Sequence, residues 1–253
     1  MSAPGIVWIT GAGSGIGRAL AVRYLRAGAI VAGTSRRVDT LDSIPGEARG
    51  AGGKFHAMPA DMTDPAAVQD VVTRIEGEIG PIRLAVFNAG THIPSPGKAF
   101  KAETVRALLD SNVMTVANGL EAVLPAMLAR HSGQVAINAS LAGYGGLPLA
   151  SAYGASKAAL INMAESLRLD LENSGVAVRL ISPGFIKTPL TDRNTFPMPF
   201  LMPVEEAAER LWRGLDFERG FEIAFPWQFA MILKILRLLP YAAYFPLVRR
   251  FTR

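Results

Sequence analysis

The chain has 253 residues, half of them hydrophobic and 19% charged, which suits a globular protein with a large core. It contains no cysteine, which excludes disulfides, thiol catalysis and cysteine-based zinc sites. Residues 223–253 carry five basic and no acidic side chains, whereas the first 222 residues carry 21 basic and 21 acidic ones. Because the main body is neutral, we expect no nucleic-acid-binding face. We also expect no metal site, because His56, His92 and His131 lie far apart and read as surface or loop residues.

Short apolar and β-branched runs alternate with segments of helical periodicity. The runs predict strands at residues 5–10, 29–35, 54–59, 83–87, 134–138, 176–181 and 221–225. The helical segments cover residues 16–27, 65–78, 102–130, 152–173 and 204–218, with a bend expected near Pro125. The alternation predicts an α/β fold, a Rossmann-type doubly wound parallel sheet of about seven strands with helices on both faces. We expect one domain over residues 1–253, with residues 226–253 as an apolar, basic C-terminal appendage.

A glycine-rich turn, TGAGSGIG at residues 10–17, joins the first predicted strand to the first helix. Glycines let a ligand's phosphates approach main-chain N–H groups, and the N-terminus of the following helix favours an anion. The spacing differs from G-x-G-x-x-G, because the sixth position is Ile16 when counted from Gly11 and Arg18 when counted from Gly13. Its place between a strand and a helix still favours a nucleotide-binding site.

The pattern T-G-x-x-x-G-x-G resembles that of the classical short-chain dehydrogenases/reductases. Further motifs similar to those of the family follow in order: Asp61 with Met62, Asn88-Ala89-Gly90, Asn112, Ser140, Tyr153-Gly154-Ala155-Ser156-Lys157, and Pro183-Gly184 with Ile186 and Thr188. Phe87 stands before N-A-G, where the family more often has Asn. The resemblance covers about residues 5–222 and fades in the tail. It implies an enzyme that transfers a hydride between a nicotinamide cofactor and a carbonyl or alcohol.

The resemblance also implies which residues bind the cofactor: Thr10, Gly11, Ser14, Gly15, Ile16, Gly17, Asp61, Met62, Asn88, Ala89, Gly90, Tyr153, Lys157, Pro183, Gly184, Ile186 and Thr188. A carboxylate at the end of the second strand would bind the ribose 2′-OH and repel a 2′-phosphate, but this position reads Ser35-Arg36-Arg37. We interpret Arg36 and Arg37 as a 2′-phosphate clamp and expect NADP(H). Asp39 lies close enough to keep NAD(H) as an alternative.

Tyr153 and Lys157 are four residues apart on a predicted helix, so both project from the same face. A nearby ammonium lowers the pKa of a tyrosine, which brings the phenol towards the range of acid–base catalysis. The resemblance implies that Tyr153 exchanges a proton with the substrate oxygen and that Lys157 tunes Tyr153 and binds the nicotinamide ribose. It further implies that Ser140 polarises the carbonyl and that Asn112 holds a water that relays protons.

The expected substrate is a small apolar ketone or secondary alcohol. The candidate lining residues are mostly apolar and include no arginine that would bind a carboxylate: Ser140, Leu141, Tyr144, Leu147, Tyr153, Phe185 and the loop 196–202. That loop belongs to a proline-punctuated stretch, residues 187–203, of the kind that often forms a lid. The alternative is a catalytically idle nucleotide-binding relative that acts as a sensor or as a membrane-surface scaffold.

The tail, residues 227–250, is rich in Leu, Ile, Phe and Tyr, with a possible helix at residues 227–239. Cations and prolines interrupt it, so it holds no uncharged run long enough to span a membrane. Two interpretations stay open: peripheral contact with an anionic membrane, or a protein-facing segment that covers the substrate cleft or a subunit interface. We expect a homo-oligomer, and a cytoplasmic protein because no signal peptide is visible. Membrane association through the tail is the alternative location.

Overall fold

Seven parallel strands form one sheet in the part of the chain that the computed structural model describes, residues 5–193 and 198–251. Their order across the sheet is β3-β2-β1-β4-β5-β6-β7, and every neighbouring pair is parallel. The strands are β1 (Ile6–Thr10), β2 (Ile30–Thr34), β3 (Lys54–Ala57), β4 (Ile82–Phe87), β5 (Gly133–Asn138), β6 (Val176–Pro183) and β7 (Glu222–Phe225). The order reverses between β1 and β4, and sheets of this kind bind ligands at the carboxyl ends of the strands beside such a point.

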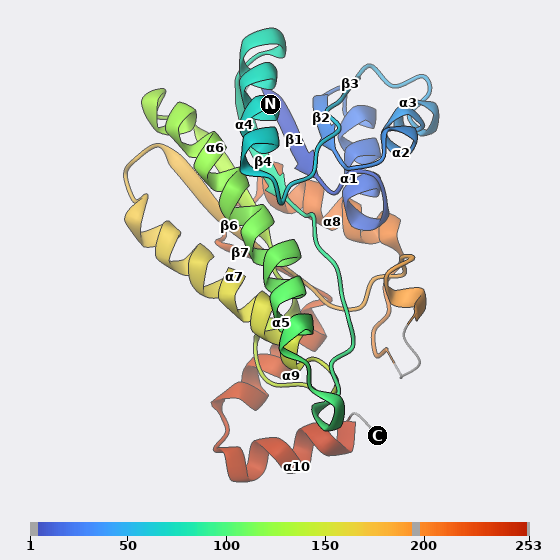
Figure 1. Ribbon diagram of the computed structural model, residues 1–253, viewed down its shortest axis with the longest axis vertical. Coiled ribbons are helices and arrows are strands. Elements are labelled where there is room, and N and C mark those ends of the chain that lie inside the picture. The colour runs from blue at the N-terminus through green and yellow to red at the C-terminus, as the bar shows by residue number, and fades with distance from the viewer. Residues whose placement is uncertain (1–4, 194–197, 252–253) are drawn as a thin grey trace.

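Helices cover both faces of the sheet, which confirms the predicted fold class (Figure 1). Helices α1 (Gly15–Arg26) and α8 (Val204–Phe217) pack together on one face, and α4 (Pro65–Arg74), α6 (Thr115–Ala129) and α7 (Ser151–Asp170) cover the other. Each face has its own apolar core. Trp8, for example, is fully buried against Phe87 and donates a hydrogen bond to Thr34 Oγ1 at 2.9 Å.

The long helix expected at residues 102–130 is interrupted. Helix α5 (Ala102–Leu109) passes through a π-helical turn, Asp110–Met114, into α6. Pro125, where a bend was expected, lies inside α6 and does not end it, and the change in helical hydrogen bonding occurs at the π turn. Ala102–Ala129 is also the one helical stretch among the described residues that is long and apolar enough to cross a membrane. Half of the most hydrophobic part of this stretch is buried inside the protein. The stretch packs on β4 and β5, as a core helix of a globular protein does.

Short helices that the sequence did not predict follow β2: α2 (Val38–Asp42) and α3 (Ile44–Glu47). Both are too short to show a helical period. In the tail, α9 (Trp227–Leu238) agrees with the expected helix, whereas α10 (Tyr241–Phe251) was not predicted. Pro240 separates α9 from α10 as expected, but Pro246 lies within α10 and does not end it. Because α9 follows β7 directly, α9 and α10 lie beyond the carboxyl edge of the sheet (Figure 1).

Candidate active site

The glycine-rich turn lies at the carboxyl end of β1 and leads into the N-terminus of α1. Gly15 has a φ of +54°, which disfavours any side chain, and a Cβ on Gly17 would lie 2.5 Å from Asn88 Nδ2. Ser14, the exposed residue before α1, makes no side-chain cap hydrogen bond, and the first turn of α1 carries no acid. Ile16 packs against the core, so the turn is held while the N–H groups at the start of the helix stay available for an anion. These features fit the diphosphate of a dinucleotide.

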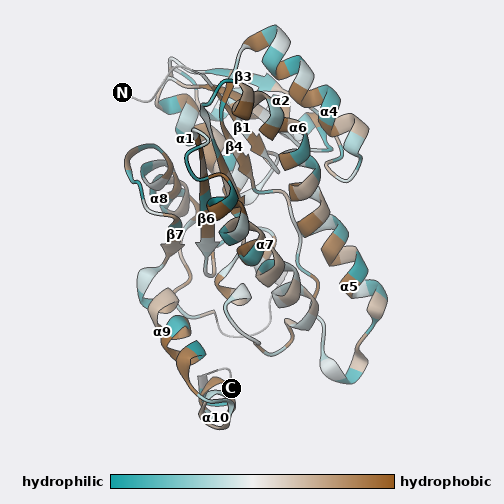
Figure 2. Ribbon diagram, turned by 90° about the vertical axis from the view of Figure 1, so that its left-hand side faces the viewer, coloured by the Kyte–Doolittle hydropathy of each residue, from teal (hydrophilic) through white to brown (hydrophobic). Residues whose placement is uncertain are grey.

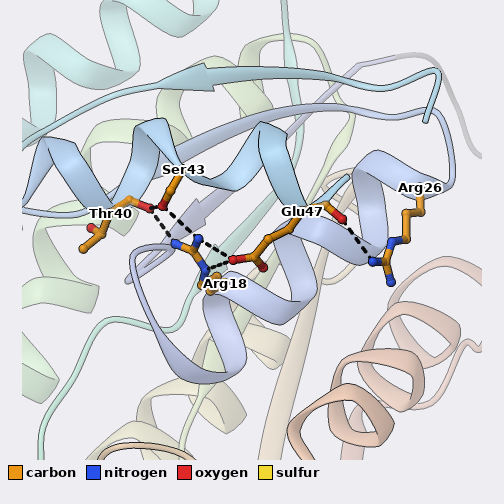
Figure 3. Close-up of polar contacts among 5 residues, drawn as sticks. All are labelled: Arg18, Arg26, Thr40, Ser43 and Glu47. Atoms are coloured by element: carbon orange, nitrogen blue, oxygen red, sulfur yellow. Dashed lines mark hydrogen bonds and ion pairs between the residues drawn. The ribbon is translucent and has the colours of Figure 1, made fainter. Parts of the chain in front are cut away.

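An arginine network holds the segment after β2 against α1 (Figure 3). Arg18 donates to the Thr40 carbonyl at 2.6 Å, to Ser43 Oγ at 2.8 Å and to the Glu47 carboxylate at 2.5 Å. In the same segment, Ser35 Oγ and Thr40 Oγ1 both donate to the Arg37 carbonyl, at 3.1 and 2.8 Å. The backbone that carries the two predicted clamp arginines is therefore fixed.

Arg36 and Arg37 are both exposed, and only one of them is placed near another predicted cofactor residue. Hydrogen bonds from the Thr63 backbone and side chain lower the pKa of Asp61, and the charge of Arg36 lowers it further. Arg36, just after β2, is thus near enough to Asp61 for its charge to act on that carboxylate, without an ion pair between them among the described residues. Met62, the next residue, is buried in the core and its carbonyl accepts a hydrogen bond from Asn118 Nδ2 at 3.0 Å.

A chain of polar contacts crosses the carboxyl ends of β1, β4 and β5. Thr10 Oγ1 accepts hydrogen bonds from the N–H groups of Asn88 and Ala89, at 3.0 and 3.1 Å. Asn138 Nδ2 donates to Asn88 Oδ1 at 2.8 Å, and Lys157 Nζ donates to the Asn138 carbonyl at 2.8 Å. The glycine-rich turn is thereby coupled to the predicted catalytic lysine. Asn138 is a residue that the sequence analysis missed, although its polar side chain at the end of an apolar strand was a usable signal.

The π turn brings Asn112 to the same place. Asn112 is fully buried, accepts a hydrogen bond from the Thr91 N–H at 2.7 Å, and donates to the Thr91 carbonyl and Ser156 Oγ at 3.0 Å each. A Cβ added to Gly90 would lie 2.9 Å from Asn112 Oδ1 and 3.7 Å from Lys157 Nζ, so these groups converge on Gly90. Single π turns inside helices are frequent at functional sites.

Lys157 is buried and Tyr153 is half-buried, and their removal from water changes their acidity. It raises the pKa of Tyr153, although a hydrogen bond with Ser140 acts in the opposite direction. It lowers the pKa of Lys157 to about 8. The Lys157 ammonium lies 5.8 Å from the centroid of the Tyr153 ring. The predicted lowering of the Tyr153 pKa is therefore wrong for the protein alone, because desolvation of the phenolate outweighs the neighbouring groups.

The segment after β6 faces the glycine-rich turn. Ser140 Oγ donates to the Pro183 carbonyl at 3.3 Å, and the Gly184 N–H donates to the Phe225 carbonyl at 2.7 Å. Ile186 is buried and forms an isolated bridge with Met202. A Cβ on Gly15 would contact the Thr188 side chain at 3.4 Å, which places Thr188 opposite the start of α1.

Beside these groups is a cavity of about 410 Å³. Its wall is mostly apolar and is built from the loops after β4, β5 and β6 and from the tail: His92, Ser140, Leu141, Ala142, Leu147, Pro148, Leu149, Ala150, Tyr153, Gly184, Phe185, Leu190, Thr191, Pro199, Phe200, Phe229, Ile232, Leu233, Leu236 and Val248. Most of the residues that the sequence predicted to line the substrate site therefore lie in this wall: Ser140, Leu141, Leu147, Tyr153 and Phe185. Within the predicted loop, Pro199 and Phe200 reach the cavity and Met202 is buried elsewhere, whereas residues 196–197 lie outside the described part of the chain.

One predicted lining residue, Tyr144, does not reach the cavity. Its hydroxyl donates to the Glu222 carboxylate, which also accepts hydrogen bonds from Ser182 Oγ at 2.7 Å and from Lys234 Nζ at 2.5 Å. Burial raises the pKa of Glu222, but the hydrogen bonds from Lys234, Tyr144 and Ser182 outweigh it and the pKa is lowered. Tyr144 thus takes part in a contact that attaches α9 to the end of the sheet.

His92 was not expected in the cavity wall, whereas the tail side chains there agree with one of the two interpretations of the tail, a segment that covers the substrate cleft. The His92 ring packs edge-on against Tyr153, with centroids 4.8 Å apart, and burial lowers its pKa. Phe229 of α9 stacks on Phe185, with centroids 5.9 Å apart. The position of His92, two residues after Gly90 of the Asn88-Ala89-Gly90 motif, was a signal that sequence reasoning could have used. The tail contacts depend on tertiary packing and had no local signal.

Comparison with known proteins agrees with this geometry. A family model described as short chain dehydrogenase matches residues 5–196. The chain is 41% identical over 233 residues to an uncharacterized oxidoreductase of Myxococcus xanthus, which spans 92% of this chain and 91% of that protein. It is 32% identical over 185 residues to the 3-oxoacyl-acyl-carrier-protein reductase FabG of Thermotoga maritima, spanning 73% of this chain and 75% of the reductase.

Solved structures give the same result. A short-chain dehydrogenase from Sphingobium yanoikuyae in complex with NADPH has a TM-score of 0.78 at 27% identity and covers 88% of each chain. A short-chain type dehydrogenase/reductase from Mycobacterium marinum has a TM-score of 0.79 at 29% identity, covering 87% of this chain and 93% of that one. The chain therefore belongs to the short-chain dehydrogenase family of NAD(P)-dependent oxidoreductases.

Proposed function

We propose that the protein is an NADP(H)-dependent oxidoreductase that interconverts an apolar ketone and its secondary alcohol. The observation that carries this proposal is the cavity of about 410 Å³, which Ser140 and Tyr153 line and which no Asp, Glu, Lys or Arg lines among the described residues. An apolar wall with a few convergent polar groups is typical of a site for a small apolar ligand. The relative FabG is named for reduction of a 3-oxoacyl group, a ketone on an acyl chain, which agrees with this substrate class.

The proposed chemistry assigns one task to each polar group at the wall. Tyr153 donates a proton to the carbonyl oxygen during reduction, and its raised pKa keeps the phenol protonated at neutral pH. Ser140, whose side chain acts on Tyr153 to lower its pKa, polarises the same carbonyl. The cofactor supplies or accepts the hydride, so the protein contributes orientation and electrostatics.

Lys157 and Asn112 act behind Tyr153. Lys157 is held by the Asn138 carbonyl at 2.8 Å and, with a pKa of about 8, is mostly charged at neutral pH. It binds the nicotinamide ribose and stabilises negative charge on the phenol oxygen. Asn112 and Lys157 converge at Gly90, so Asn112 positions a water through which Lys157 exchanges protons with solvent.

The preference for NADP(H) rests on Arg36. The segment that carries Arg36 is fixed through Arg18 and Thr40, and its charge lies near Asp61. A guanidinium at this position suits a 2′-phosphate, whereas a bound NAD(H) would lack that partner. NADPH in the related Sphingobium yanoikuyae dehydrogenase supports the preference.

The tail serves as a wall of the substrate cavity. Its inner side chains Phe229, Leu233 and Leu236 line the cavity, and the Lys234–Glu222 ion pair attaches α9 to β7 at 2.5 Å. This favours the protein-facing interpretation of the inner face of the tail. No observation favours the catalytically idle alternative.

The experiment that tests the function measures oxidation of NADPH in the presence of apolar ketones of graded size. The parent protein should turn over at least one of them, and Tyr153→Phe should lose about a hundredfold to ten-thousandfold in kcat while still binding NADPH. Tyr241→Phe is the matched control, because this hydroxyl is outside the cavity wall and its loss should leave kcat unchanged. Near-parental kcat in Tyr153→Phe would exclude the proposed proton donor.

A further inference from the structure

Helix α9 is apolar on two opposite faces. Ala230, Leu233 and Leu236 are buried towards the protein. A second stripe, at spacings of four, four and three residues, points away from it. Its members are Trp227, Met231, Ile235 and Leu238, which are exposed by 62, 48, 55 and 84%.

Helix α10 extends this outer surface. Tyr241 and Phe245 are exposed, and their rings stack with centroids 5.5 Å apart. In Figure 2, α9 and α10 project from the end of the molecule beyond the sheet, with hydrophobic segments along them. We call six of the exposed apolar and aromatic side chains of the two helices the outer apolar face: Trp227, Met231, Ile235, Leu238, Tyr241 and Phe245. A soluble monomer rarely exposes apolar side chains grouped in this way without a partner for them.

The charged side chains that the tail itself carries after Glu222 are of one sign. No Asp or Glu follows Glu222 in the sequence, and Glu222 is paired with Lys234 at the inner side of α9. The exposed cations Arg237, Arg249 and Arg250 remain, and Arg237 donates to the Tyr241 hydroxyl at 3.3 Å. A partner that covers the outer apolar face must therefore tolerate or neutralise positive charge.

We propose that the outer apolar face of α9 and α10 docks on an anionic lipid surface. Apolar and aromatic side chains enter the boundary between head groups and acyl chains, and the rim arginines contact the anionic head groups. A second copy of this chain is a poorer occupant. A two-fold contact through the same face would bring the three arginines of each copy together, and the tail offers no carboxylate to neutralise them.

Docking of this kind places the substrate cavity beside the lipid. The same helix carries the outer stripe and the wall residues Phe229, Ile232, Leu233 and Leu236, and Ile232 is itself 38% exposed. An apolar substrate dissolved in the bilayer would reach the cavity without crossing water. Only this consequence rests on the proposed function, because docking itself does not depend on the chemistry.

The test is co-sedimentation of the full chain with vesicles of phosphatidylcholine alone or of phosphatidylcholine mixed with phosphatidylglycerol. The parent should bind the anionic vesicles, and high salt should weaken that binding. Replacing Arg237, Arg249 and Arg250 together by Gln should lower partitioning by about fivefold for each cation, or about a hundredfold in all. Arg74, Arg106 and Arg168, which are exposed on other helices, are replaced in the control and should leave binding unchanged.

A second variant tests the apolar contribution. Met231→Gln with Ile235→Gln and Leu238→Gln should abolish sedimentation, whereas Leu169→Gln, at a 73% exposed position of α7, should not. Retained NADPH binding shows that the variants are folded. The proposal is overturned if the parent binds neither vesicle or if the apolar variant binds as the parent does. It is also overturned if light scattering shows a dimer that the apolar variant loses while no vesicle is bound, because the face is then an interface between copies. Turnover is not measured, so these outcomes are independent of the proposed reaction.

Discussion

Lys157 should destabilise the folded protein at neutral pH, and the size of this effect follows from its burial. The side chain is 5% exposed, and burial lowers its pKa from the ordinary value of 10.5 to about 8. At about 1.4 kcal/mol for each pKa unit, the difference corresponds to about 3 kcal/mol against folding when the lysine is charged. Because the folded state binds its proton less tightly than the unfolded state, this cost is complete below about pH 8 and fades towards pH 10.5.

The perturbation is Lys157→Met, which keeps the length of the side chain and removes the charge. We expect the free energy of unfolding of the variant minus that of the parent to be about 2–3 kcal/mol larger at pH 7 than at pH 10, so the variant gains stability at neutral pH. The hydrogen bond to the Asn138 carbonyl is lost at both pH values, so it cancels in this comparison. Urea unfolding followed by circular dichroism at the two pH values gives the required numbers.

Lys98→Met is the control, because this lysine is exposed and its ammonium is solvated in both states. Its free energy of unfolding relative to the parent should change little between the two pH values. A difference for Lys157→Met that stays constant between pH 7 and pH 10 would refute the reasoning, since the lysine would then bind its proton equally well in both states.

Three further changes test the cofactor site, the attachment of the tail and the cavity wall. Arg36→Ala should weaken NADPH binding by about ten- to a hundredfold and leave NADH nearly unchanged, as measured by fluorescence titration; equal loss for both cofactors would contradict the 2′-phosphate contact. Glu222→Gln should lower the free energy of unfolding by about 1–3 kcal/mol at pH 7 and raise KM for the ketone, because a half-buried charged acceptor loses its role in holding α9. Since the pKa of Glu222 is lowered, the parent should lose this stabilisation as the pH falls below the ordinary value of 4.5, and an equal acid response in both proteins would count against the ion pair. His92→Phe should keep kcat within about threefold, since ring contact with Tyr153 persists, whereas His92→Ala should lower it further; equal rates would show that the contact does not position Tyr153.

The parts of the site that the sequence predicted share one physical origin. Parallel strands end at the same edge of a sheet, so polar residues directly after strands must meet there. Thr10, Asn88 and Ser140 follow this rule. Lys157 lies one helical turn after Tyr153 on the same face of α7, and it reaches the end of β5 through its hydrogen bond to the Asn138 carbonyl. The alternation of strands and helices likewise determined the layers of the fold.

The parts that the sequence did not predict depend on packing between distant segments. Nothing near Tyr144 in the chain signals that Glu222 and Lys234 will meet it. The direction of the Tyr153 pKa was wrong for a related reason, because helical spacing gives the neighbouring ammonium but not the depth of burial. Whether the tail would cover a cleft or contact lipid could not be decided from composition, because α9 is apolar on both of its faces.

The acidities of Tyr153 and Lys157 suit the protonated phenol from which the proposed carbonyl reduction starts. Reduction needs a protonated phenol as donor, and burial keeps Tyr153 in that form at neutral pH. Oxidation needs a phenolate as base, and the desolvation that raises the pKa opposes its formation. Lys157 is still charged at neutral pH, so it can stabilise the phenolate left after the proton is donated. The apolar wall that α9 supplies contributes to the same result, because excluding water from the cavity raises the energetic cost of an unpaired phenolate.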